Sequence, residues 1–326
     1  MIRSRWGVVV GLLVATFTFA GCGGRGASGG AIPGAIPGAP DRPSFGPSGD
    51  LIYAAKRNVV YLFTYPAGKH VAQFVPPNAV DIRGLCSDTS GNVFVAANGS
   101  VHGSGVVYEY AHGSTSPTRT LSLTSGFDVT GCAVDPQSAV IAVALNEKTQ
   151  GQIALYSNPS GDPHFTNISP YRATSLTYKD STDIIAWTDT GLILIKWKLG
   201  DGWRAGPIYI PRKTKNHGRY VQWTGKRLAL LIRSPAIKSR IRRLRVVGEG
   251  ATISGTTTFK DLGRGSGIGF CVQGSRILLP MGEAKNKSSI GIYPYPAGGE
   301  PETVIKGYDA DLLTVSVSSS RTRSLR

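Results

Sequence analysis

Cysteine is scarce in this chain of 326 residues. There are four cysteines, and Cys22 follows an apolar N-terminal stretch, which leaves Cys86, Cys132 and Cys271 for the rest of the chain. Three cysteines are too few for the disulfide framework of a small secreted domain, although they allow one bridge in an oxidising compartment. The alternative is that all three are small buried hydrophobic residues on inner strands. The sequence leaves both interpretations open.

Long hydrophobic runs are almost absent. Residues 6–20 form an uncharged run of about 15 residues, shorter than the roughly 20 residues that span a bilayer core. No comparable run follows. Arg3 and Arg5 precede the run, and small residues follow it. A positive start, an apolar stretch and small residues are typical of a secretory signal peptide, so residues 1–21 are predicted to be a signal and not a permanent anchor.

The segment that ends this stretch, Phe19-Ala20-Gly21-Cys22, resembles the lipobox of bacterial lipoproteins. The resemblance implies cleavage before Cys22 and acylation of its sulfur, whereas the alternative is a plain secretory signal with a chance cysteine. Acyl chains contribute roughly 0.8 kcal/mol per buried methylene, so a multiply acylated cysteine would hold the protein stably on a membrane. We therefore expect an extracytoplasmic, lipid-anchored protein of the bacterial cell envelope.

The next segment, residues 22–50, has little that could form a core. Glycine and proline make up half of residues 23–50, and such a composition cannot bury enough apolar surface to offset the entropy of ordering. We expect a disordered tether there. The remainder is long enough for one large domain, which we place at residues 51–318, followed by a polar tail at residues 319–326.

Helical periodicity is also missing, because no segment keeps a period of 3.6 for ten residues. Instead the chain has short apolar runs rich in β-branched residues, which predict strands. The clearest runs are residues 93–97, 140–145, 184–187, 228–232 and 277–280. The fold class is therefore expected to be all-β.

An internal repeat predicts the architecture. The motif Tyr-Pro-Ala-Gly at residues 65–68 recurs at residues 295–298, which is 230 positions or five periods of 46 later. Four short strands in each period are the signature of a β-propeller blade. The first unit, at residues 51–55, lacks an opening strand, and residues 312–318 form an opening strand with no blade to follow. We predict a six-bladed propeller closed by pairing these N-terminal and C-terminal strands, which removes two exposed edges.

Residues 85–97, Leu-Cys-Ser-Asp-Thr-Ser-Gly-Asn-Val-Phe-Val-Ala-Ala, resemble the opening of an NHL repeat. The chain is thus similar to six-bladed propellers of the NHL-repeat and gluconolactonase-like type. That resemblance implies, as an alternative function, a lactonase or esterase that holds Ca²⁺ or another divalent metal through Asn98, Asn146 and Asp189. The competing interpretation of these three residues is that they cap strand ends in turns.

Familiar catalytic patterns are missing as well. The five histidines have no spacing that makes a metal pair or a Ser-His-Asp order, and the chain has no Gly-x-Ser-x-Gly elbow. Gly265-x-Gly267-x-Gly269 precedes an expected strand and not a helix, which excludes the dinucleotide-binding interpretation. We therefore expect a non-catalytic module that needs no cofactor.

Acidic residues are absent from residues 202–248, which contain 13 Lys or Arg. The whole chain has 36 basic and 20 acidic residues, so removing those 13 leaves 23 against 20. Concentrated positive charge attracts polyanions. The residues proposed as an anionic-ligand surface are Arg212, Lys213, Lys215, Arg219, Lys238, Arg240, Arg242 and Arg243.

Two interpretations of this charge remain open. The first is a binding site for an anionic polysaccharide, a lipid or an envelope protein, and the second is a solvated basic face. No nucleic-acid partner is expected for an exported protein. A purely structural envelope protein that only holds other subunits would look the same in the sequence.

Overall fold

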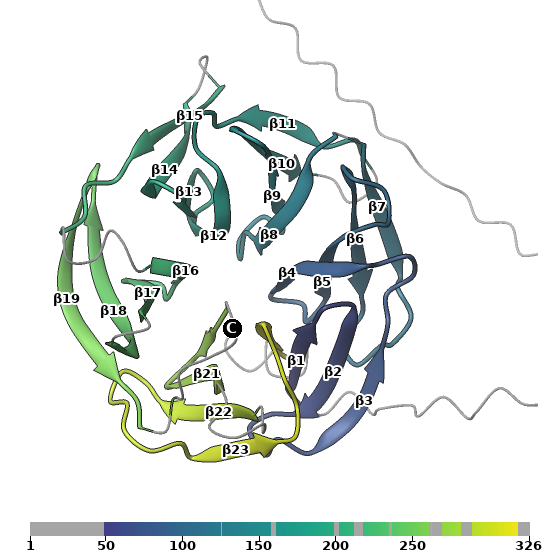
Figure 1. Cartoon of the computed structure of the whole chain (residues 1–326), viewed down its shortest axis with the longest axis vertical. Helices are drawn as coiled ribbons and strands as arrows, with labels where there is room; N and C mark the ends of the chain where they lie inside the picture. Colours follow the sequence, from purple (N-terminus) through teal and green to yellow (C-terminus); the bar gives the residue numbers. More distant parts are fainter. Residues whose placement is uncertain are drawn as a thin grey trace, which may run out of the picture. The chain divides into compact units, whose positions relative to one another are not determined.

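The computed structural model describes residues 49–124, 126–157, 161–198, 202–211, 218–234, 237–260, 262, 269–281 and 289–318. The predicted signal peptide, Cys22, nearly all of the predicted tether and the tail at 319–326 lie outside these residues. The described strands form six four-stranded sheets arranged as blades around a central axis (Figure 1). The predicted six-bladed, all-β propeller is therefore confirmed.

Each blade is an antiparallel sheet in which the first strand lies nearest the centre of the ring and the fourth lies at its rim. The first three blades are, in that order, β24 (Leu312–Ser316), β1 (Leu51–Lys56), β2 (Val59–Thr64) and β3 (His70–Phe74); β4 (Asp81–Ser87), β5 (Val93–Asn98), β6 (Ser104–Tyr110) and β7 (Arg119–Thr124); and β8 (Asp128–Val134), β9 (Ile141–Glu147), β10 (Gln150–Tyr156) and β11 (His164–Asn167).

The second half of the ring follows the same order. Its blades are β12 (Ala173–Asp180), β13 (Asp183–Thr188), β14 (Gly191–Lys198) and β15 (Gly202–Pro207); β16 (Gly218–Trp223), β17 (Leu228–Ser234), β18 (Ile237–Val247) and β19 (Gly250–Thr258); and β20 (Cys271–Gln273), β21 (Arg276–Met281), β22 (Ser289–Pro294) and β23 (Thr303–Lys306). The blades are numbered one to six in this sequence order.

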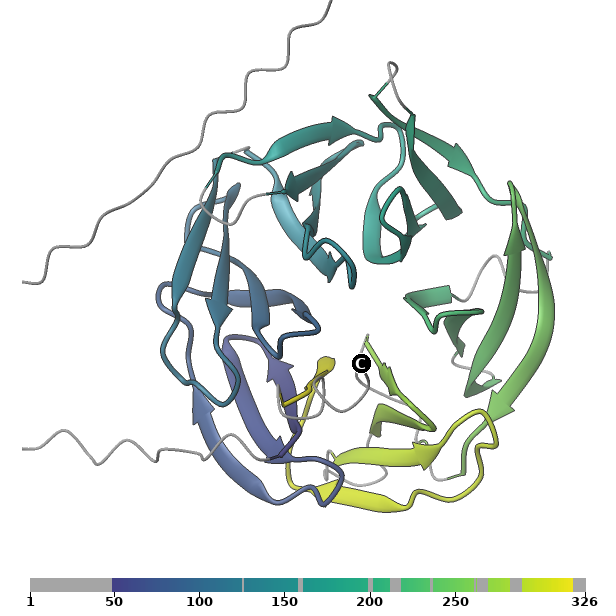
Figure 2. The same cartoon turned by 180° about the vertical axis from the view of Figure 1, so that it is seen from behind.

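Blade one is closed by the two ends of the described chain. Strand β24 pairs antiparallel with β1, with Leu51 opposite Ser316 and Ala55 opposite Leu312. Figures 1 and 2, which view the ring from its two sides, both show β24 in yellow beside β1 in purple. This pairing gives β1 a neighbour on each side, so neither strand is left as an open edge.

The hydrophobic core is divided into layers between neighbouring blades. Blades four and five, for example, bury Trp187, Leu194, Leu230 and Leu244 against one another. Middle strands are apolar on both faces because each face meets another blade, and all six residues of β13 are buried. One blade alone would leave both faces exposed, so the ring is the stable unit.

Packing explains the glycine that ends each Tyr-Pro-Ala-Gly turn. Gly68 and Gly298 both have positive φ, 70° and 75°, where glycine is favoured. A Cβ at Gly298 would lie 2.2 Å from the carbonyl oxygen of Thr258 on the outer strand of blade five, and one at Gly68 would lie 2.7 Å from Ile305 on the outer strand of blade six. Each turn therefore packs against the rim of the preceding blade.

The ring has two faces, and the chain enters on one of them. We call tether face the face that carries the loops between first and second and between third and fourth strands, which in blade two are residues 88–92 and 111–118. His112 in the second loop lies with Nε2 2.9 Å from the carbonyl oxygen of Gly49. The amide of Ser318 donates to Asp50 Oδ1 at 3.0 Å. Both described ends are thereby fixed to the tether face.

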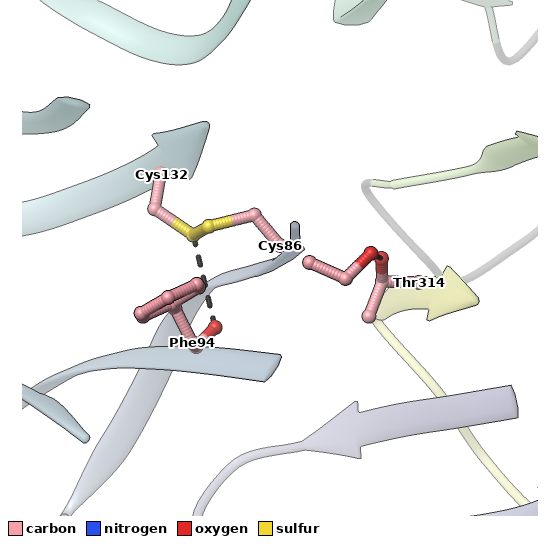
Figure 3. Close-up of a disulfide and its surroundings, with 5 residues drawn as sticks. Cys86, Phe94, Cys132 and Thr314 are labelled. Atoms are coloured by element: carbon pink, nitrogen blue, oxygen red, sulfur yellow. Dashed lines mark hydrogen bonds between the residues drawn. A yellow bond between two sulfur atoms is a disulfide. The ribbon is translucent and has the colours of Figure 1, made fainter. Parts of the chain in front are cut away.

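A disulfide joins Cys86 on β4 to Cys132 on β8, with the two Cα atoms 6.0 Å apart (Figure 3). The bridge links the inner strands of blades two and three. Cys271 is a buried free thiol. Of the two interpretations that the sequence left open, the single bridge is the one that the structure contains.

No helix among the described residues is long and apolar enough to cross a membrane.

Candidate functional site

The amide of Asn98, one of the three residues of the alternative metal site, binds the backbone of the following blade. The N–H of Val129 donates to Asn98 Oδ1 at 2.7 Å, and Asn98 Nδ2 donates to the carbonyl oxygen of Val129 at 3.2 Å. A side-chain amide carries one acceptor and one donor, so Asn98 can bond to both backbone groups of Val129, as a residue on a neighbouring β-strand would. This contact accounts for Asn98 at the end of β5 without a metal.

Asn146 has a similar environment one blade later. Its side chain is buried, and Nδ2 donates to the carbonyl oxygen of Ala173 on β12 at 2.7 Å. Its Oδ1 has no hydrogen-bond partner among the described residues. Asp189 is an exposed turn residue after β13 whose amide lies 3.3 Å from the carbonyl oxygen of Arg172. The described residues contain no cluster of three His, Cys, Asp or Glu side chains that could hold a metal ion.

Blade five makes a contact with blade six that the sequence did not predict. Gln222 Nε2 donates to the carbonyl oxygen of Val272 at 3.1 Å, and the amide of Val272 donates to Gln222 Oε1 at 2.6 Å. This is the same double contact that Asn98 makes with Val129. Because Gln222 lies on a first strand and Asn98 on a second strand, alignment of the repeats does not place the two residues together.

Two nucleophilic groups of the described residues, the Cys271 thiol and the Ser316 hydroxyl, are enclosed. Burial raises the pKa of the Cys271 thiol to about 12, so it carries almost no thiolate at neutral pH. Ser316 lies 2.6 Å from His112 Nδ1, but its side chain has no exposed surface. That Ser–His contact joins β24 to blade two and offers no access to a substrate.

The basic residues of the proposed anionic surface all map to blade five or to the segment before it. Arg212, Lys213 and Lys215 lie outside the described residues. Arg219 lies on β16 and Lys238 on β18, although their side chains are not described. Arg240, Arg242 and Arg243 lie on β18, the third strand of the blade.

Strand alternation separates these three arginines. Arg240 and Arg242 share a face with Leu244, which packs in the core between blades four and five. Arg243 lies on the other face with Ile241, which packs between blades five and six. The Arg243 guanidinium covers Gly255, where a Cβ would be 2.2 Å from its Nη2. The structure therefore brings Arg240 and Arg242 together but not Arg243.

Arg242 is an unusual residue to bury, with a residue exposure of 6%. Burial lowers the pKa of its guanidinium, and the charge of Arg240 lowers that pKa further. Both effects disfavour the charged form of the side chain. Arg240 and Arg242 therefore lie close enough on one face of β18 for their charges to interact.

Acidic side chains compensate basic ones in the other blades. Lys56 lies 3.0 Å from Asp311, Lys179 lies 2.6 Å from Asp183, and Arg276 lies 2.6 Å from Glu302. The four strands of blade five, by contrast, contain no Asp or Glu in their sequences. The positive potential predicted from the sequence therefore belongs to one sector of the ring.

Comparison with known proteins supports the fold alone. No family model and no curated protein sequence matches the chain. Among solved structures, it is similar to the β-propeller domain of Cps50 (Swd1) from Myceliophteria thermophila, with 14% identity, a TM-score of 0.53 and coverage of 82% of this chain and 85% of that one.

Two further structures give the same result. A chain of the nidogen/laminin complex has 10% identity and a TM-score of 0.57, and the match covers 83% of this chain and 99% of that one. TolB from Acinetobacter baumannii has 13% identity and a TM-score of 0.52, and the match covers 76% of this chain and 61% of TolB. These values show a shared propeller architecture.

Proposed function

We propose that this chain is an exported bacterial lipoprotein whose propeller is a non-catalytic binding or scaffolding module for an anionic polymer of the cell envelope. The observation that carries the proposal is the charge of blade five, whose strands contain basic but no acidic residues. A β-propeller binds ligands with its loops and blade surfaces, and a positively charged sector such as blade five attracts polyanions.

The disulfide supports export. Disulfides form and persist in oxidising compartments and are rare in the cytosol, and Cys86 and Cys132 are bridged here. The N-terminal sequence supports the lipid anchor at Cys22, because the apolar run before it is followed by Phe19-Ala20-Gly21-Cys22. Metabolic labelling with a fatty acid checks the anchor: the wild-type precursor should incorporate label, and Cys22→Ala should not.

Polymer binding is tested with a soluble chain that begins at Gly23, lacks the predicted signal peptide and Cys22, and contains all six blades and the closing strand. We expect it to be retained by dextran sulfate but not by neutral dextran, and to elute with salt because screening weakens charge–charge attraction. Replacement of Arg212, Lys213, Lys215 and Lys238 by Glu is expected to abolish that retention.

A matched control carries the same four charge reversals in other blades, at the exposed residues Arg57, Lys69, Lys148 and Lys306. We expect this variant to keep most of its retention, since its blade five is intact. Equal loss in both variants would mean that net charge alone governs binding, and retention of the blade-five variant would contradict the proposed site.

A further inference from the structure

An exposed apolar pair lies at the rim of blade five. Val247, the last residue of β18, is opposite Gly250 of β19, and Tyr209 bridges to the outer side of Gly250. The amide of Ala251 donates to the carbonyl oxygen of Tyr209 at 2.9 Å, which fixes that segment. Because glycine has no side chain, Val247 and Tyr209 flank an open position on one face of the sheet. They are 65% and 70% exposed.

Arginines stand beside this pair. Arg245 is exposed and lies two residues before Val247, so both side chains are on the same face of β18. Arg227 directly precedes Leu228, whose partner on β18 is Leu244. Arg227 and Arg245 therefore lie next to each other at the end of the sheet.

We call the basic-apolar patch the five residues Tyr209, Lys226, Arg227, Arg245 and Val247. Lys226 is exposed in the loop between β16 and β17. That loop and the turn between β18 and β19, residues 248–249, both belong to the tether face. One acidic residue, the exposed Glu249, lies in the same turn.

The chemistry of the patch suits a lipid surface better than a soluble polymer. A tyrosine ring is amphipathic and favours the boundary between headgroups and acyl chains. Arginine donates to phosphate with two parallel hydrogen bonds, and basic residues near an anionic bilayer are attracted by its surface potential. An exposed valine at the tip of a hairpin contributes nothing to a hydrated polyanion, but it gains by burial among lipid.

The position of the first described residues also supports a lipid surface as the partner of the patch. Gly49 and Asp50 are held on the tether face by His112 and Ser318. They lie beside blade two, which stands across the ring from blade five (Figure 1). Cys22 precedes Gly49 by 27 residues, and a disordered tether of that length, as the sequence predicts, would have an end-to-end distance of about 30 Å. A tether of this length gives an effective concentration on the order of millimolar, so a weak contact is sufficient.

We propose that the basic-apolar patch docks the propeller on an anionic lipid bilayer with its tether face toward the membrane. The inference rests on the proposed lipid anchor, which brings this face within reach of the bilayer. The opposite face, where the loops between second and third strands lie, is then directed away from the membrane and toward partners.

The patch is tested first by the position of a probe. The soluble chain from Gly23 onward lacks Cys22, its disulfide occupies Cys86 and Cys132, and Cys271 is buried. Val247→Cys can therefore be labelled selectively with an environment-sensitive fluorophore. Val101→Cys, at a residue that is 68% exposed in the β5–β6 loop of the opposite face, is the matched control.

With vesicles of equal parts phosphatidylcholine and phosphatidylglycerol, we expect a blue shift for the Val247→Cys label and none for the Val101→Cys label. Vesicles of phosphatidylcholine alone should give no shift for either. Equal shifts at both positions, or a shift at Val101→Cys only, would overturn the proposal.

Charge reversal gives a second, independent measurement. Arg227→Glu with Arg245→Glu is expected to weaken cosedimentation with the same vesicles by about tenfold or more. Arg57→Glu with Arg172→Glu changes two exposed arginines of the opposite face and is expected to leave it unchanged.

The dextran sulfate assay separates this inference from the proposed function. A variant that loses vesicle binding but keeps polymer retention supports a dedicated membrane patch. Wild-type chain that binds dextran sulfate but no vesicle refutes the patch and leaves the polymer site standing. Absence of fatty-acid labelling at Cys22 removes the anchor from the proposed function, whereas the vesicle measurements still decide what the patch binds.

Discussion

At the scale of single residues, side-chain amides join neighbouring blades near the centre of the ring. Asn98 and Gln222 each pair with both the N–H and the carbonyl of one residue in the following blade. Polar groups that would be costly to bury are thereby satisfied. The same residue types that resemble metal ligands in the sequence therefore stabilise the contact between blades in the structure.

The free energy of unfolding is expected to depend on pH through the carboxyl of Glu109. Burial raises the pKa of its carboxyl, and Arg119, 3.3 Å away, opposes that shift only in part. A carboxyl with a raised pKa in the folded state binds protons more tightly there than in the unfolded state. Its effect on stability is therefore most unfavourable above the folded pKa and disappears as the pH falls below the unfolded pKa.

Glu109→Gln removes that titration. We expect the variant to lose a part of the pH dependence of the free energy of unfolding between the unfolded and folded pKa values, and to be no less stable than wild type at neutral pH. Urea denaturation at a series of pH values measures this. A variant whose stability falls most at neutral pH would show that the ion pair with Arg119 outweighs the cost of burial.

At the scale of elements, the closing strand decides whether the ring exists. Strand β24 supplies the inner strand of blade one, and Ser87 on β4 donates to the carbonyl oxygen of Val315 at 2.9 Å. Without β24, strand β1 would become an open edge and the apolar layers beside it would be exposed.

Deletion of residues 312–326 is expected to abolish cooperative thermal unfolding and to promote aggregation. Deletion of residues 319–326, which lie beyond β24, is the control and should leave the melting temperature within a few degrees of wild type. Calorimetry and size-exclusion chromatography of the two truncated chains check this. Cooperative unfolding of the shorter chain would mean that closure of blade one is dispensable.

At the scale of the whole molecule, the disulfide restrains two neighbouring blades in the unfolded chain. It closes a loop with a sequence separation of 46 residues, for which the chain-entropy relation gives about 4 kcal/mol of stabilisation. In a ring, loosening the contact between two blades exposes the apolar faces of both, so this local bridge affects the stability of the entire propeller.

Cys86→Ala with Cys132→Ala is therefore expected to lower the free energy of unfolding by about 2–4 kcal/mol. Urea titration of the double variant and of wild type, each with and without reductant, measures the difference. Reductant should shift the wild-type midpoint toward that of the variant and leave the variant unchanged. A midpoint that does not respond to reductant in wild type would contradict the bridge.

The basic-apolar patch shows why sequence reasoning found the charge but not the site. The excess of Lys and Arg at residues 202–248 is visible in the composition. Tyr209 and Val247 are 38 positions apart in the chain, and they flank Gly250 only because the rim of blade four pairs with that of blade five. No local pattern encodes that neighbourhood.

The sequence by itself determined the fold class, the number of blades and the strand that closes them. Short apolar runs rich in β-branched residues and a repeat near 46 residues can be read along the chain, and an unfilled opening position in blade one leaves one way to complete the ring. The tertiary structure decided which side chains meet. Gly84 of β4 and Gly131 of β8 occupy equivalent positions in their blades. Cys86 is two residues after Gly84, whereas Cys132 is one residue after Gly131. Because successive side chains point to opposite faces, that single step turns the two sulfurs toward each other, and the same alternation sends Arg242 and Arg243 to different blades.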